Sequence, residues 1–106
     1  MEREEIERIM DEIGIQYEYY QFEENTISPP YMVWYYGDQN TFAADGAVYY
    51  KSDQIIIALC CDTFRRDLEE KIEAVLAQHG LFYEAQREAI EDSMGTIYET
   101  VYEMEV

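Results

Sequence analysis

Residues 28–62 constrain the fold of this chain most strongly, because two strand-like runs lie there on either side of a polar stretch. The runs are SPPYMVWYY and AVYYKSDQIIIALCCD, and the polar stretch is GDQNTFAADG. Aromatic and β-branched residues favour strands. The connection over 37–46 is long for a simple hairpin, and long ordered loops are frequently functional. The pattern predicts two strands joined by a functional loop, with Asp45 and Gly46 forming its turn.

The two runs differ in how their side chains alternate. The strand expected over 31–36 is apolar on both faces, which indicates a buried or central strand, and Gly37 and Asp38 are expected to end it. In the second run, the apolar residues of 47–50 fall on even positions and those of 55–61 on odd positions. A continuous strand would send these two sets to opposite faces, so the pattern predicts a bulge or bend at 51–54.

Two amphipathic helices flank this central segment. The spacing of apolar residues predicts one helix over 2–13, ended by Gly14, and a second over 63–79, capped by Asp62 or Thr63 and ended by Gly80. The expected buried stripes are Ile6, Ile9, Met10 and Ile13 in the first helix, and Phe64, Leu68, Ile72, Val75 and Leu76 in the second.

The remaining segments are expected to be extended. Residues 15–22 are rich in Tyr and Phe, and residues 96–106 alternate, with Glu on one face. Residues 81–91 favour a helix by propensity. However, IEAVLAQHGLFYE repeats the earlier IERIMDEIGIQYE at an offset of 66 residues, as a helix, a glycine and an extended segment. We therefore expect 81–91 to be extended as well.

These elements predict a single α+β domain over residues 1–106. Two helices with one apolar stripe each must bury those stripes, so we expect a mixed, mostly antiparallel sheet with both helices packed on one face. The other face is expected to carry Tyr, Trp34 and Met side chains. Such a face is a candidate contact surface for another subunit.

The charge of the chain excludes several partners. It carries 24 acidic against 7 basic residues, a formal net charge of −17. Repulsion from phosphates argues against direct nucleic-acid affinity and against binding to anionic membranes. The N-terminal segment has no apolar signal-peptide core, and no run approaches the roughly 18 apolar residues of a membrane span. We expect a protein of the cytosol with no membrane partner.

Motifs for catalysis or metal binding are missing from the sequence. His79 is the single histidine and lies at a helix C-terminus, where it is favoured for capping. The adjacent Cys60 and Cys61 would point to opposite faces of a strand and are expected to be small buried residues. Acidic pairs such as Glu69 and Glu70 indicate a solvated face, and the loop aspartates lack calcium-loop spacing. We therefore expect no enzymatic activity, no cofactor and no metal.

The chain resembles the small tail terminator proteins, also called tail-completion or head–tail joining proteins, of long-tailed phages and prophages. The residues that carry the resemblance are SPPYMVWYY, NTFAADGAVYY, the helix 63–79 with GLFYE, and AIEDSMGTIYETVYEMEV. The resemblance implies an α+β fold and a homo-hexameric ring, without enzymatic activity. Such a ring caps the tail tube and joins it to the head connector proteins. It also implies assembly in the host cytoplasm and a final place at the tail–head junction of the virion, where DNA passes through the lumen.

On this interpretation the loop and the sheet face make protein contacts. The candidate contact residues are Asn40, Phe42, Asp45 and Gly46 in the loop, with Phe42 as the apolar anchor, and Trp34 and Tyr36 on the sheet. Three alternatives stay open. They are the neighbouring connector (stopper) protein, an acidic DNA mimic that inhibits a host DNA-binding enzyme, and, least supported, a small acid–base enzyme.

Overall fold

The computed structural model describes residues 1–20, 28–44, 47–92 and 95–105, which form two helices and five strands. In chain order the elements are α1 (Arg3–Ile13), β1 (Tyr17–Tyr19), β2 (Tyr31–Ala44), β3 (Ala47–Cys61), α2 (Arg66–Gln78), β4 (Tyr83–Asp92) and β5 (Gly95–Glu105).

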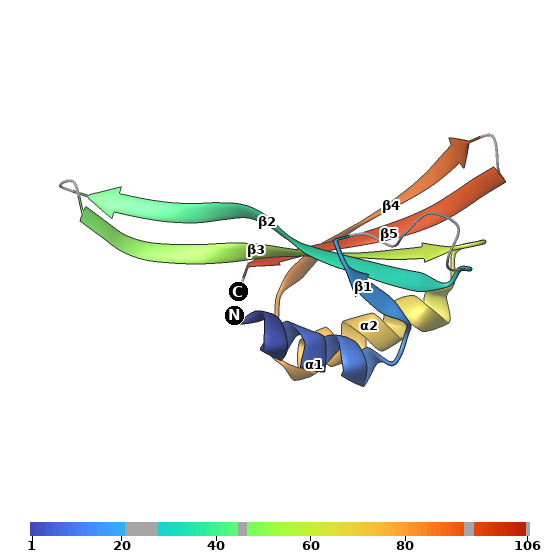
Figure 1. Ribbon diagram of the computed structural model, residues 1–106, viewed down its shortest axis with the longest axis horizontal. Helices are drawn as coiled ribbons and strands as arrows, with labels where there is room; N and C mark the ends of the chain where they lie inside the picture. The colour runs from blue at the N-terminus through green and yellow to red at the C-terminus, as the bar shows by residue number, and fades with distance from the viewer. Residues whose placement is uncertain (21–27, 45–46, 93–94, 106) are drawn as a thin grey trace.

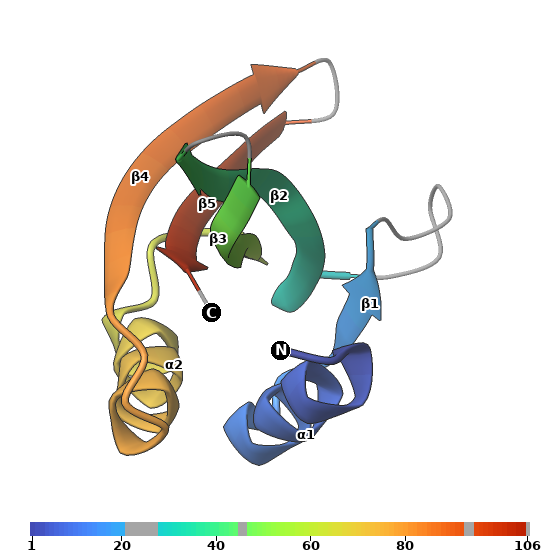
Figure 2. The same cartoon turned by 90° about the vertical axis from the view of Figure 1, so that its left-hand side faces the viewer.

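The five strands form one mixed sheet in the order β1-β2-β3-β5-β4. Only β1 pairs in parallel, with β2, and the other three pairings are antiparallel. Both helices lie on the same side of the sheet, which curves around them (Figure 2). The predicted α+β fold is therefore confirmed, as is the extended assignment of the segment after α2. We call the side of the sheet turned away from the helices the open face.

The expected loop over 37–46 is wrong for its described part, because β2 continues through Gly37 and Asp38 to Ala44. The ladder shifts between Tyr36 and Gln39, where two residues of β2 stand against one residue of β3, Gln54. A bulge therefore lies near the expected position, but its extra residue belongs to β2 instead of β3. β3 itself continues through residues 51–54 as one strand. A second shift follows Phe42. Two bulges allow long strands where alternation in the sequence indicated a break.

The buried face of α1 and the glycines that end both helices are as predicted, whereas the N-terminus of α2 is not. The four apolar residues of the α1 stripe are buried, and Gly14 ends α1 in the left-handed region, with φ of +80°. At the end of α2, Gly80 has φ of +70° and Leu81 N–H donates to the Leu76 carbonyl, which closes the helix. The start of α2 differs from the prediction: Arg65 precedes the helix without a side-chain cap, and Phe64 is exposed.

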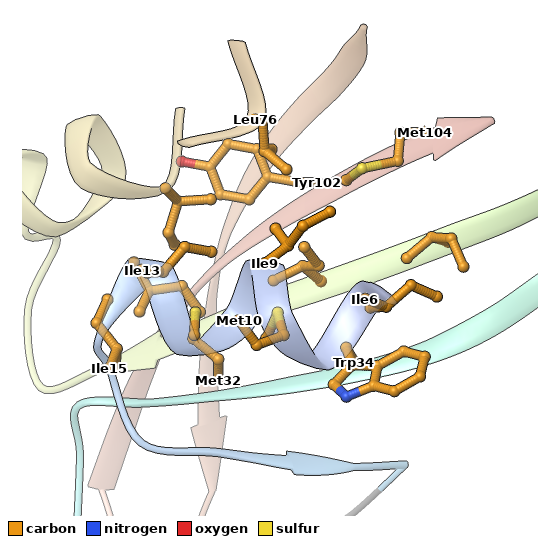
Figure 3. Packing of buried hydrophobic residues seen from close by; sticks show 14 of the residues in the cluster. Ile6, Ile9, Met10, Ile13, Ile15, Met32, Trp34, Leu76, Tyr102 and Met104 are labelled. Carbon is orange, nitrogen blue, oxygen red and sulfur yellow. The ribbon is translucent and has the colours of Figure 1, made fainter. Parts of the chain in front are cut away.

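The core lies between the helices and the covered face of the sheet (Figure 3). Trp34 and Tyr102 are its largest buried side chains, and both are 0% exposed. The Trp34 ring lies 4.7 Å from Tyr19 and 5.6 Å from Tyr36, measured between ring centroids. The prediction that Trp34 and the methionines line an uncovered face is therefore wrong. Before the first bulge, Met32, Trp34 and Tyr36 of β2 lie on the covered face.

Candidate protein-contact surface

The distal halves of β2 and β3 form a two-stranded arm that leaves the body of the molecule. The ladder from Gln39–Asp53 to Ala44–Ala47 joins only β2 and β3, because the pairing of β3 with β5 begins at Gln54. Figure 1 shows this arm extending past both helices. An isolated two-stranded hairpin is marginally stable in water. An arm of this kind gains stability when it packs against another molecule.

Two of the predicted loop contact residues lie on the arm. Asn40 pairs with Ser52, and Phe42 pairs with Tyr50, both in the β2–β3 ladder. The turn expected at Asp45 and Gly46 lies outside the described residues. Tyr36 lies at the base of the arm, on the covered face, and its hydroxyl donates to the Met1 carbonyl at 3.2 Å. The structure therefore separates the six predicted contact residues: Trp34 belongs to the core and Tyr36 packs against it.

The open face carries aromatic and aliphatic side chains on β2 and β3. Tyr31, Val33, Tyr35 and Ile56 are partly exposed there, and we call them the apolar patch. Tyr20 extends the patch: it is 66% exposed, and its ring lies 6.1 Å from that of Tyr35. Its φ of +74° is uncommon for a bulky residue. The backbone N–H of Tyr20 donates to the Trp34 carbonyl at 2.8 Å, which holds this conformation.

Beside the patch, the open face becomes acidic. Glu84 lies directly opposite Glu103, and Glu88 lies directly opposite Glu99, in the β4–β5 ladder. We call these four residues the glutamate rows. Burial raises the pKa of Glu99, and the nearby charge of Glu88 raises it further. Burial also raises the pKa of Tyr35, with contributions from the Glu99 and Glu103 charges. The rows therefore form a region of negative potential next to the aromatic rings.

The helix side of the same hairpin carries an ion pair between a buried carboxylate and a half-exposed arginine. Glu69 of α2 is 1% exposed, and it accepts hydrogen bonds from Arg87 at 2.6 and 2.8 Å and from Thr100 at 2.7 Å. Arg66 donates a fourth bond at 3.2 Å. The bonds from Arg87, ahead of those from Thr100 and Arg66, lower the pKa of Glu69 to about 2. The prediction that Glu69 belongs to a solvated acidic face is wrong, because its partners come from β4 and β5, distant in sequence.

A cleft of about 350 Å³ lies over this ion pair. Glu73 lines it and accepts hydrogen bonds from Arg66, at 2.8 and 3.1 Å, and from the Tyr102 hydroxyl at 2.9 Å. The two arginines and two glutamates of the cleft thus bind one another. This arrangement explains the cleft as a bracing network between α2 and the β4–β5 hairpin.

The histidine and the two cysteines lie in surroundings that indicate structural roles. His79 Nε2 lies 2.8 Å from Glu12 Oε2, which joins the ends of the two helices. Cys60 and Cys61 are free and buried on opposite faces, as predicted. Burial and the Glu99 charge raise the pKa of Cys60 to about 11, so its thiol is protonated at neutral pH. Among the described residues, no cluster of three or more His, Cys, Asp or Glu side chains is placed to hold a metal ion.

Neither described helix is long and apolar enough to cross a membrane. No protein-family model matches this chain, and no curated protein sequence matches it.

The glutamate rows were not predicted from the sequence. Alternation over 96–106 placed Glu99 and Glu103 on one face of a strand, which was half of the signal. Their partners Glu84 and Glu88 lie in a segment with mixed preferences, and only the β4–β5 register shows that the four carboxylates face one another.

Proposed function

We propose that this protein is a non-enzymatic subunit of a ring at the tail–head junction of a phage virion, a tail terminator that caps the tail tube and joins it to the head connector proteins. Similarity of the quoted sequence segments to that family supports the proposal. The structural observation that carries it is the β2–β3 arm, which has sheet partners only within itself between Gln39 and Asp53.

The arm suits a role in ring assembly and docking. Strands without sheet neighbours present unpaired backbone groups along both edges, which other chains can pair with or cover. In a closed ring each subunit offers one surface to the next, so an arm that reaches beyond its own body can contact a neighbouring subunit or the tube. The extents of the molecule, 52 × 30 × 22 Å, reflect this reach.

The charge of the chain fits a ring through which DNA passes. Six copies of a chain with charge −17 carry −102 in total. An acidic lumen repels phosphates, so DNA slides without binding. The same repulsion acts between subunits, so ring assembly should be favoured by salt that screens it.

The test combines mass measurement with imaging. Native mass spectrometry across a range of salt concentrations should show a ring-sized oligomer, and negative-stain images with tail tube protein should show the protein on tube ends. The decisive variant replaces residues 37–54 by Asn-Gly, because Tyr36 and Ile55 pair directly and a two-residue turn can join them.

We expect this armless variant to keep a cooperative thermal unfolding transition and to lose binding to tube ends. The matched control is Glu4→Gln/Glu5→Gln, on the exposed side of α1, which should bind as the parent does. Failure of the parent chain to bind tube ends would contradict the proposal. Capture of a host DNA-binding enzyme, reversed by added DNA, would instead support the DNA-mimic alternative.

A further inference from the structure

The glutamate rows place like charges directly opposite each other without a base to separate them. Glu84 opposes Glu103 and Glu88 opposes Glu99, and Glu103 continues beside Ile56 and Glu99 beside Cys60. Outside the arm, the described strand residues on the open face include no lysine or arginine. Like charges directly opposite each other destabilise a sheet. The Cys60 thiol donates a long hydrogen bond to Glu99 at 3.9 Å, but it carries no positive charge, so the repulsion between the facing carboxylates remains.

On the covered face of the β4–β5 hairpin, by contrast, a carboxylate is paired with a base. Arg87 lies between Gln86 and Glu88 in sequence, yet it pairs with Thr100 in the ladder and binds the buried Glu69 on the helix side. The strand thus uses its single base to neutralise an internal carboxylate and leaves Glu88 facing Glu99. The Arg87–Glu69 pair thus has a role inside the molecule. By contrast, no base of the described strands neutralises the facing charges of Glu88 and Glu99.

We propose that the open face is a docking surface for another protein, through a segment that carries lysine or arginine side chains next to apolar ones. The basic groups pair with the glutamate rows, and the apolar groups cover the apolar patch. Tyr20 and Tyr35 add ring faces that attract cations. This inference concerns the open face and does not depend on the role proposed for the arm.

The two halves of the surface are close enough for one segment to cover both. Ile56 of the patch is the direct ladder partner of Glu103, so the boundary between the halves is a single strand spacing of about 4.8 Å. Glu99 and Glu103 lie four residues apart on β5, on the same face. An extended segment matches this arrangement when the side chains on one of its sides are basic at one end and apolar at the other.

Charge selects the class of occupant. A second copy of this chain is a poor match, because four of its seven bases, Arg3, Arg65, Arg66 and Arg87, already bind carboxylates of their own chain. Nucleic acids and anionic lipid surfaces share the sign of the rows and are repelled. A basic protein segment is the occupant that relieves the repulsion within the face.

The test uses a defined probe, the fluorescein-labelled peptide Lys-Ser-Lys-Ser-Val-Ser-Tyr, with the full chain, because its basic and apolar side chains lie on one side when the peptide is extended. Fluorescence anisotropy at 20, 100 and 300 mM NaCl should show saturable binding that weakens with salt. The same peptide with glutamate in place of lysine should not bind. The test variant is Glu99→Gln/Glu103→Gln, and the control with the same change in net charge is Glu4→Gln/Glu5→Gln on α1.

We expect the open-face variant to weaken peptide binding by about tenfold or more, and the α1 control to change it less than about threefold. Val33→Ser, in the apolar patch, should weaken binding at all three salt concentrations. Circular dichroism and thermal melting establish that each variant is folded. Equal weakening by the two double variants, or no saturable binding by the parent chain, would overturn the proposal.

Discussion

Arg87 of β4 donates two hydrogen bonds to the buried carboxylate of Glu69 of α2, at 2.6 and 2.8 Å. This pair joins a helix to the edge strand of the sheet, and Thr100 of β5 adds a third bond. The bidentate geometry is the strong form of an arginine–carboxylate contact. The orientation of the β4–β5 hairpin, and of the glutamate rows on its other face, therefore depends on a polar contact within the body.

Removal of this arginine should strongly destabilise the fold. In Arg87→Ala, Glu69 keeps its burial but loses two of its four hydrogen bonds and its bidentate cation, so a buried carboxylate is left only partly compensated. The free energy of unfolding from urea titration should fall accordingly. Arg65→Ala is the matched control, because Arg65 binds the exposed Asp67, and it should cost clearly less because water screens an exposed pair. Equal losses in the two variants would show that the Glu69 pair is not a bracing contact.

The same pair predicts a dependence of stability on pH. The pKa of Glu69 falls from 4.5 to about 2 on folding, so its ionised form is favoured in the folded state. This contribution is present above about pH 4.5 and is lost as the pH falls toward 2. The difference in unfolding free energy between the parent chain and Glu69→Gln should therefore shrink between pH 4.5 and pH 2. A difference that is constant over this range would contradict the assignment.

Relief of repulsion in the glutamate rows should stabilise the protein. Glu99→Gln removes one of two facing charges, and we expect a gain of about 0.2–1 kcal/mol at pH 7 and low salt. Thermal melting at 20 and 500 mM NaCl measures this gain, which should shrink at high salt because the repulsion is screened. Glu4→Gln, on the exposed side of α1, should show no such gain. A loss of stability in Glu99→Gln would mean that the hydrogen bond from the Cys60 thiol, 3.9 Å from Sγ to Oε2, outweighs the repulsion.

Trp34 is expected to behave as a core residue. Trp34→Ala should cost about 3–5 kcal/mol, because it removes a fully buried ring. Tyr35→Ser, at the next position on the open face, should cost much less. Trp34 is the single tryptophan, so its emission maximum reports burial directly and should shift to longer wavelength on unfolding. An emission maximum typical of exposed tryptophan in the folded protein would contradict this placement.

Phe42→Ala tests the arm as a contact element. The backbone of Phe42 pairs with Tyr50 of β3 in the arm, beyond the part of β2 and β3 that contributes to the core. We expect the free energy of unfolding to change little and the binding to tail tube ends to weaken. A large loss of stability in the isolated protein would instead assign Phe42 to a core.

Local patterns in the sequence were sufficient for much of the fold. Apolar residues at helical spacing and the glycines at positions 14 and 80 determined both helices and their ends, since these signals act over a few residues. The repeat with an offset of 66 residues correctly indicated a strand after α2. By contrast, the continuation of β2 through Gly37 was mispredicted, because a bulge and the pairing with β3 override local preference there. The start of α2 was also mispredicted, since the helix begins at Arg66 without the expected side-chain cap.

What the sequence determined by itself is the α+β class, the two helices and the strongly acidic charge, from which we expect no direct nucleic-acid affinity. Only the tertiary structure decided which face each strand residue occupies. It buried Trp34, paired Glu69 with Arg87 and set Glu88 against Glu99. The reason is that cross-strand register joins residues far apart in sequence, and a shift of one residue moves every side chain of a strand to the other face.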